Sequence, residues 1–168
     1  MISGGKEGKL VTVGLCLRNC EATIKETIIG ILKQDFPSDQ MEIIVVDDGS
    51  QDRTVSLVVE SLSNLKEQLR IFFTKGKGLG TARQLVLENA KGKYIVWVDG
   101  DIILPKNHVR KQVEFMEKNP KVGKARARWG ILNEGNLVSN LESLRTLERD
   151  DLDPVSYTHL TLPTNREV

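Results

Sequence analysis

The chain has 168 residues, with 24 lysines and arginines against 23 aspartates and glutamates, so its formal net charge of +1 gives no argument for nucleic-acid binding. No stretch approaches the roughly 18 apolar residues of a membrane-spanning helix, and the N-terminus lacks the apolar segment of a signal peptide. Two cysteines, Cys16 and Cys20, with no histidine nearby, cannot complete a four-ligand zinc site, so we expect structural thiols in a reduced, cytoplasmic chain.

Strand and helix patterns alternate along most of the chain. Short runs of β-branched and apolar residues predict strands, and apolar residues three or four positions apart predict helices. This alternation predicts one α/β domain with a mostly parallel sheet and helices on both faces. The expected strands are Leu10–Leu17, Met41–Val46, Arg70–Thr74, Tyr94–Val98 and Lys121–Trp129. The expected inward helix residues are Ile24, Ile28, Ile31 and Leu32; Val55, Val58, Leu62, Leu65 and Leu69; Ala82, Leu85, Val86 and Ala90; and Val109, Val113 and Met116, in a helix whose first turn holds Pro105.

The C-terminal part departs from this pattern. Leucines from Leu137 to Leu147 suggest one more helix, which ends in the acidic stretch Glu148–Asp153. Residues 154–168 show no helical stripe and no strand that ends in acids, and they resemble the translated read-through of a sequencing adapter. We therefore expect a truncated domain over residues 8–153, a tail over 154–168 that is not part of the fold, and a longer parent protein.

Two of the expected buried strands run directly into carboxylates. The second strand is followed by Asp47 and Asp48, and the fourth by Asp99 and Asp101, which one glycine separates. In open α/β sheets ligands bind outside the carboxyl ends of the strands, and right-handed crossovers bring these ends to one edge. The intervening Gly100 would let an ion or ligand approach closely. Paired carboxylates suit Mg²⁺ or Mn²⁺, which complete their shells with substrate phosphate oxygens.

A loop rich in glycine and lysine, Lys75–Gly80, lies between the third strand and its helix. Backbone N–H groups and lysine charges both attract anions, so the loop is a candidate phosphate site. Arg83 lies in the first turn of the helix that follows, near this loop. The same sheet edge would therefore carry four acids and a cationic, glycine-rich loop.

Taken together, these segments resemble the nucleotide-sugar-binding part of family 2 glycosyltransferases, which have the Rossmann-like GT-A fold. The resemblance covers Leu10–Leu104 and rests on four segments that stand in the family's order. It implies a GT-A fold that is incomplete at the C-terminus. The matching segments are Arg18-Asn19 after the first strand, Val45–Ser50, Gly78–Arg83, and Asp99-Gly100-Asp101 in the place of the family's DXD motif.

The resemblance implies a role for each residue of a nucleotide-sugar site. Asp48, together with Asp47, would hydrogen-bond the nucleobase, usually uracil, and Arg83 would lie near the base or the phosphates. Asp99 would face the ribose and the sugar, and Asp101 would hold the Mg²⁺ or Mn²⁺ ion, with Asp99 as a further metal ligand. The expected donor-binding residues are Arg18, Asn19, Asp47, Asp48, Gly78, Arg83 and Asp99.

The implied function is that of a hexosyltransferase. It would transfer a sugar from a nucleotide-diphospho-sugar, with UDP-sugars favoured, to a glycan, lipid or other acceptor, with inversion at the anomeric carbon. The departing nucleoside diphosphate gains charge, which a metal bound to both phosphates would stabilise. The family also allows the parent protein to associate with the cytoplasmic face of a membrane.

Two departures from the family pattern stand out. Arg18 occupies a place where the family usually has an aromatic residue, so the stacking role of that position is open. The family's general base lies in the acceptor half, which starts near Trp129 and is cut short here. No catalytic residue is therefore assigned, and we expect that the fragment can bind a donor without transferring the sugar.

Three other interpretations stay open at this point. A phosphoacceptor receiver domain also places an acid pair and a later aspartate around Mg²⁺, with Asp101 as the phosphorylation site, but its acid pair follows the first strand. A dinucleotide-binding domain is weaker, because Gly76, Gly78 and Gly80 lack the G-x-G-x-x-G spacing and lie in the third strand–helix unit. A purely structural interpretation treats the acids as solvated strand ends.

Two smaller features complete the analysis. His108 follows Pro105 and is expected on the surface. The segment Lys106–Arg128 carries eight lysines and arginines against two glutamates, which suits either a solvated surface or an anionic acceptor or membrane.

Overall fold

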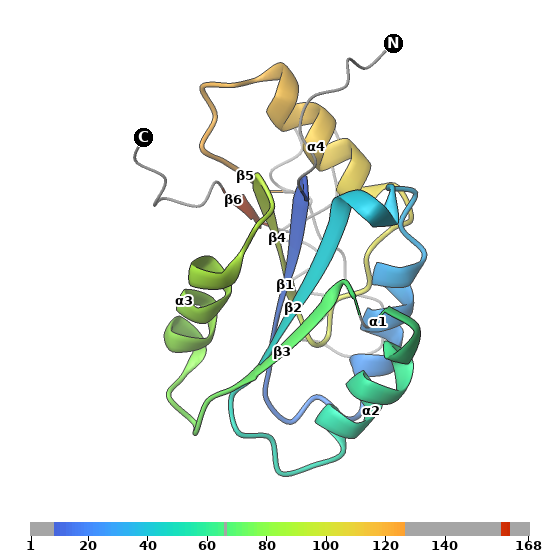
Figure 1. The fold of residues 1–168 in the computed structure, drawn as a ribbon, viewed down its shortest axis with the longest axis vertical. Coiled ribbons are helices and arrows are strands. Elements are labelled where there is room, and N and C mark those ends of the chain that lie inside the picture. The colour runs from blue at the N-terminus through green and yellow to red at the C-terminus, as the bar shows by residue number, and fades with distance from the viewer. Residues whose placement is uncertain (1–8, 66, 127–158, 162–168) are drawn as a thin grey trace, which may run out of the picture.

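The computed structural model describes residues 9–65, 67–126 and 159–161, and it shows one sheet with helices on both faces (Figure 1). The strand order is β3-β2-β1-β4-β6-β5, in which the first four strands pair in parallel and β6 pairs antiparallel with β4 and β5. The expected α/β fold with a mostly parallel sheet is confirmed. The elements are β1 Val11–Leu17, α1 Ile24–Leu32, β2 Met41–Asp47, α2 Thr54–Ser61, β3 Leu69–Phe73, α3 Leu79–Asn89, β4 Tyr94–Asp99, α4 His108–Lys118, β5 Lys124–Arg126 and β6 His159–Thr161, with short 3-10 turns at Ser38–Gln40 and Ser63–Leu65.

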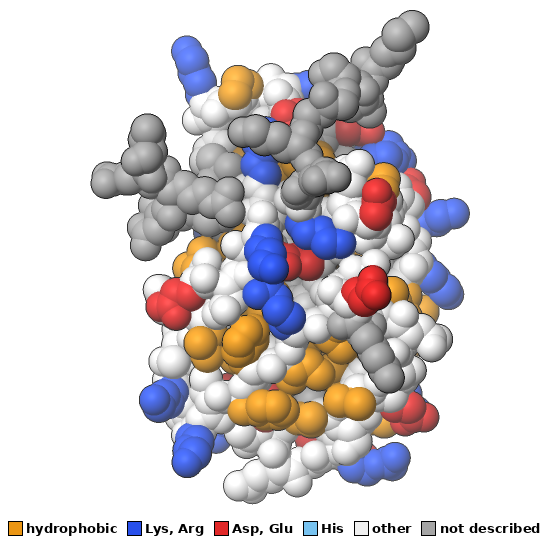
Figure 2. Space-filling view, in the orientation of Figure 1, with side chains coloured by type: hydrophobic (Ala, Val, Ile, Leu, Met, Phe, Trp, Pro, Cys, Tyr) orange, Lys and Arg blue, Asp and Glu red, His pale blue; other side chains and the backbone are white. Residues whose placement is uncertain are grey.

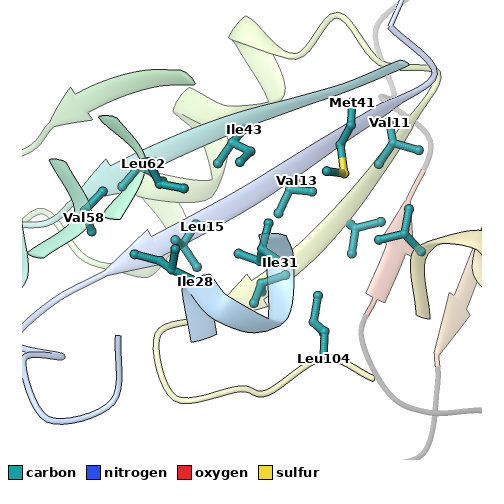
Figure 3. Close-up of a cluster of buried hydrophobic side chains, with 14 of the residues drawn as sticks. Val11, Val13, Leu15, Ile28, Ile31, Met41, Ile43, Val58, Leu62 and Leu104 are labelled. Atoms are coloured by element: carbon teal, nitrogen blue, oxygen red, sulfur yellow. The ribbon is translucent and has the colours of Figure 1, made fainter. Parts of the chain in front are cut away.

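The sheet divides the hydrophobic core into two layers. Because successive side chains of a strand point to opposite faces, each central strand contributes to both layers. One layer packs under α1, α2 and α4 (Figure 3), and the other packs under α3 on the opposite face (Figure 1). The first layer includes Val11, Val13, Leu15, Ile28, Ile31, Met41, Ile43, Val58 and Leu62; the second consists of Cys16, Ile44, Val46, Ala82, Val86, Ile95 and Trp97.

The helix pattern was wrong at three positions. Leu32, expected to face inward, is 46% exposed at the end of α1. Leu69, assigned to the second helix, starts β3 and pairs with Ile43, because a 3-10 turn already ends the helical segment at Leu65. Pro105 precedes α4 rather than lying in its first turn. The other inward positions of these helices are buried or partly buried, and Leu57 joins them.

Only a few of the C-terminal residues are described, so the structure tests the predictions for this part of the chain at those residues alone. β5 covers three residues of the expected strand Lys121–Trp129. His159–Thr161, from the tail that we expected to be outside the fold, form β6 between β4 and β5, so the structure departs from that expectation at these three residues. The expected helix from Leu137 and the rest of the tail lie outside the described residues.

Exposed hydrophobic side chains gather around β3 and the start of α3, in the lower half of the face in Figure 2. Phe73 is 64% exposed and Leu79 is 49% exposed. β3 is an edge strand of the sheet, and no other described strand pairs with its outer side. Among the described helices, none has the length and apolar composition that crossing a bilayer requires.

His108, expected on the surface, is buried with 2% of its surface exposed. It is the first residue of α4 and lies on the same helix face as Gln112, which is also 2% exposed. Burial disfavours the charged imidazolium, and it lowers the pKa of His108 to about 4. The sequence pattern missed this because one histidine before an apolar stripe carries no signal of its own burial.

This burial predicts a pH dependence of folding. In the unfolded chain His108 takes up a proton near pH 6.5, whereas in the folded chain it does so only near pH 4. The unfolded state therefore binds more protons than the folded state between these two pH values. The free energy of unfolding keeps its full value above pH 6.5 and decreases as the pH falls toward 4. We expect a loss of about 2 kcal/mol between pH 7 and pH 5 relative to His108→Gln, measured by urea unfolding. Parallel pH profiles of the two proteins would contradict it.

Candidate functional site

The acids that end β2 and β4 lie at one edge of the sheet, as predicted. β1 lies between these two strands, with Leu17 opposite Asp47 and Cys16 opposite Asp99. Neighbouring strands are about 4.8 Å apart, so the two strand ends are separated by about 10 Å. The loops that follow β1, β2, β3 and β4 therefore surround a common space.

The carboxylate of Asp47 accepts hydrogen bonds from the turn that directly follows it in the sequence. Its Oδ2 atom accepts hydrogen bonds from the N–H groups of Gly49 at 3.1 Å and Ser50 at 3.0 Å, and its Oδ1 atom accepts one from the Ser50 hydroxyl. The residue is 4% exposed. All these partners lie within three positions in the sequence, so the carboxylate of Asp47 shapes the loop rather than the space in front of it.

Asp48 instead joins the ends of β2 and β3. Its Oδ1 atom accepts hydrogen bonds from the Thr74 hydroxyl and from the N–H of Lys77 at 2.8 Å, and Oδ2 accepts one from the N–H of Gly78 at 2.8 Å. The Thr74 hydroxyl, followed by these N–H groups and the nearby Arg18 charge, lowers the pKa of Asp48. A carboxylate has about four acceptor positions, so roughly one, on Oδ2, is left for a ligand.

The glycine-lysine loop differs from the predicted phosphate site. The N–H groups of Lys77 and Gly78 point at Asp48, so they are not available to an anion. Gly78 has φ of 88°, a left-handed conformation that a residue with a Cβ rarely adopts, and it serves as the N-cap of α3. The loop is thus organised around a carboxylate of the protein, and it fixes the start of the helix that carries Arg83.

Asn19 links the loop after β1 to the loop after β2 by hydrogen bonds. It adopts φ of 51°, its side-chain oxygen accepts a hydrogen bond from the N–H of Gln51 at 2.8 Å, and its own N–H bonds the Ser50 hydroxyl at 2.9 Å. A second, reciprocal pair links Glu21 and the segment 52–53: the N–H of Glu21 donates to Asp52 and that of Arg53 donates to Glu21. These bonds hold Arg18 in place through the backbone of its neighbour.

The backbone of the turn at Asp99–Asp101 is held by hydrogen bonds from Thr23 and Thr27. The hydroxyls of Thr23 and Thr27 donate to the carbonyl of Gly100 at 2.8 Å and 3.0 Å. A Cβ on Gly100 would lie 2.5 Å from the sulfur of Cys20, so this glycine is required for the turn to pack against the loop after β1. The turn therefore presents two carboxylates to solvent from a fixed backbone.

The two acids of this turn fit a divalent cation that a ligand helps to bind. The side chain of Asp99 is 50% exposed, and Asp101 is exposed. In the described part of the chain, no three His, Cys, Asp or Glu side chains lie close enough to hold a metal by themselves. Mg²⁺ and Mn²⁺ take one or two carboxylates and fill the other positions with water and phosphate oxygens, which matches this donor set.

Arg83 reaches the same turn from α3. Its Nη2 atom is 3.6 Å from Oδ1 of Asp99, and its guanidinium lies 5.6 Å from the centre of the Trp97 ring. Its Nε atom is buried and has no hydrogen-bond partner among the described residues. Arg83 therefore lies beside the β4 acids, and its side chain is still 40% exposed.

The two cysteines are structural, as predicted. Cys16 is buried among the side chains under α3, and burial raises the pKa of its thiol to about 12. Burial also raises the pKa of Cys20, whose thiol donates to the carbonyl of Arg18 at 3.4 Å. Both thiols therefore stay protonated at neutral pH, and Cys20 fills the space behind Gly100.

Two residues of the site were missed in the sequence. Thr74 ends the third expected strand, and its place at a strand end was the available signal for its contact with Asp48. Trp97 precedes Asp99 by two positions, so the period of a strand places both on the face that α3 covers. Its contact with Arg83 depends on how α3 packs, which the strand pattern does not give.

The fold resembles that of solved glycosyltransferases with the GT-A fold. A crystal structure of Staphylococcus aureus TarS residues 1–349 in complex with UDP is 28% identical, with a TM-score of 0.66, and the match covers 76% of this chain and 38% of that one. The mannosyltransferase PcManGT from Pyrobaculum calidifontis, in complex with GDP-Man and Mn²⁺, has a TM-score of 0.69 at 23% identity, over 90% of this chain and 44% of that one, and shows the likeness of the fold.

The chain belongs to glycosyl transferase family 2, whose model matches residues 12–159. Relatives include the putative glycosyltransferase EpsE of Bacillus subtilis, 32% identical over 67% of this chain and 40% of its own length. An uncharacterized glycosyltransferase of Haemophilus influenzae is 29% identical over 66% of this chain and 43% of its own. The chain thus spans less than half the length of these curated relatives. Family membership removes the support for the receiver and dinucleotide-binding interpretations.

The hydrogen bond from Thr74 to Asp48 can be tested directly. Thr74→Val keeps the shape of the side chain and removes the hydroxyl, so we expect the pKa of Asp48 to rise and the amides of Lys77 and Gly78 to exchange faster. Carboxyl NMR titration and hydrogen exchange measure these changes. As a control, Thr81→Val removes a hydroxyl that donates to the carbonyl of Lys77 instead, and it should leave the pKa of Asp48 unchanged. An equal effect of both variants would contradict the prediction.

Proposed function

We propose that this chain is the donor-binding part of a glycosyltransferase that uses a nucleotide-diphospho-sugar, with a UDP-sugar as the favoured donor. The observation that carries the proposal is the state of Asp48, which is charged, nearly buried and left with about one open acceptor position. Such a group selects a ligand that brings one hydrogen-bond donor. The β4 acids lie at the same edge of the sheet and suit the diphosphate side of the ligand.

The hydrogen bonds of Asp48 favour uracil over guanine. Uracil offers one ring N–H, which a single carboxylate oxygen can accept. Guanine offers a ring N–H beside an amino group, a pair best met by both oxygens of a carboxylate, and here Oδ1 is already taken by Thr74 and Lys77. The crystal structures of the related Staphylococcus aureus TarS in complex with UDP and with UDP-GlcNAc agree with this preference.

The diphosphate would lie in front of β4. Asp99 and Asp101 would hold a Mg²⁺ or Mn²⁺ ion there, which would neutralise the charge that develops on the departing nucleoside diphosphate. Arg83 adds a positive charge beside Asp99, and its partly exposed guanidinium can donate hydrogen bonds to a phosphate oxygen. Asn19 and Asp47 would act by fixing the loops, since their side chains are engaged in those loops.

The acceptor half would complete the reaction in the longer parent protein. We propose a glycan, a lipid or another hydroxyl-bearing acceptor, an inverting displacement, and a general base supplied by residues beyond this donor-binding part. The parent would work in the cytoplasm, including at the cytoplasmic face of a membrane. The basic segment from Lys106 onward would then face an anionic acceptor or lipid.

Calorimetric titration of UDP, with and without Mn²⁺, tests the proposal. We expect Mn²⁺ to tighten UDP binding, and Asp101→Asn to remove that metal dependence. Asp48→Asn replaces an acceptor oxygen with a donor amide, so it should weaken UDP on the order of 10-fold or more. Circular dichroism would show that each variant is folded.

The matched control is Asp39→Asn, which alters an exposed acid before the amino end of β2, far along the strand from the site. It should bind UDP like the unaltered chain. A folded chain that does not bind UDP at all, or an Asp48→Asn variant that binds as tightly as the Asp39→Asn control, would overturn the proposal.

A further inference from the structure

We infer that Arg18 is a specificity-determining residue that reads the nucleobase edge in the plane of the ring, by donating to the carbonyl beside the N–H group that Asp48 accepts. This inference rests on the proposed function and adds a residue and a mode of recognition to it. Arg18 directly follows β1, at the position where the family usually has an aromatic residue.

The guanidinium of Arg18 lies on the base side of the site. Its Nη1 atom is 3.8 Å from Oδ2 of Asp48, and both terminal nitrogens lie within 4 Å of the point that a Cβ on Gly76 would occupy. Its charge contributes to the lowered pKa of Asp48. The β4 acids lie after a different strand, on the other side of β1. Arg18 is therefore directed toward Asp48 and the loop after β3, away from the expected diphosphate.

The separation of Arg18 and Asp48 leaves both groups free to bond the same edge of a ligand side by side. At 3.8 Å the pair is too long for a direct hydrogen bond, so the charges attract while each group keeps its bonding capacity. The open acceptor position lies on Oδ2, the same oxygen that faces Arg18. An acceptor and a donor thus stand side by side.

An adjacent acceptor and donor match one edge of uracil. The ring N–H of uracil is flanked by a carbonyl on each side, so whichever way the ring enters, a carbonyl lies next to the N–H group. A guanidinium is a rigid planar donor that suits such an edge. The side chain of Arg18 is 59% exposed, so it can adjust to the ring without displacing a packed group.

The backbone below Arg18 is held firmly. The neighbouring Asn19 ties the loop to Ser50 and Gln51, and the N–H of Cys20 donates to the hydroxyl of Thr54 at 2.7 Å. The exposed side chain of Arg18 thus extends from a fixed backbone. This favours a contact that forms only with the ligand, in contrast to a packed aromatic platform.

Three ligands and three variants test this inference. UDP, uridine and inorganic pyrophosphate are titrated, by calorimetry or by competition, into Arg18→Met, Arg18→Tyr and the control Arg110→Met, which removes a partly exposed arginine of α4 outside the site. We expect Arg18→Met to weaken UDP and uridine by the same factor, on the order of 10-fold, and to leave pyrophosphate unchanged. Arg18→Tyr should not restore binding, and Arg110→Met should match the unaltered chain.

Each alternative role gives a different result and would overturn the inference. A phosphate contact would weaken UDP and pyrophosphate while sparing uridine. A stacking role would be rescued by Arg18→Tyr. Tight UDP binding by Arg18→Met would show that Arg18 takes no part, while the proposed function would stand. Absence of UDP binding by the unaltered, folded chain would overturn both.

Discussion

The rest of the site depends on keeping the carboxylate of Asp48 charged while it is almost completely removed from water. Burial alone would favour its protonated form, and hydrogen bonds from Thr74, Lys77 and Gly78 reverse that preference. Meeting this requirement brings the end of β3 and the following loop onto the end of β2. The start of α3 is fixed in the same step, and with it the approach of Arg83 to Asp99.

The loops around this carboxylate are preorganised by short polar contacts rather than by apolar packing. Asn19 and Glu21 bond the loop after β2, and Thr23 and Thr27 bond the turn after β4, so the segment from Asn19 to Thr27 contacts the loops on both sides of β1. Each such bond is worth about 1 kcal/mol, but together they fix the donor and acceptor groups before a ligand arrives. Preorganisation of this kind lowers the entropic cost of binding.

The positions of the acids could be predicted, whereas their partners could not. Asp48 and Asp99 stand at the ends of apolar runs, and the rule that parallel strands end at one edge is enough to bring them together. The separate roles of Asp47 and Asp48 were not predictable, because both follow the same strand and differ only in which loop supplies their N–H donors. The expectation that the glycine-lysine loop offers its N–H groups to a phosphate was incorrect at Lys77 and Gly78 for the same reason.

The sequence by itself determined the order and type of the main elements, the parallel sheet, and the edge where the site lies. These follow from the period of the apolar residues and from the handedness of the crossovers, which are local or general properties of the chain. Only the tertiary structure decided that His108 is buried, that Trp97 lies under Arg83, and that Arg18 faces Asp48 across 3.8 Å. Such contacts depend on how closely particular helices and loops pack, and residues distant in the sequence set that packing together.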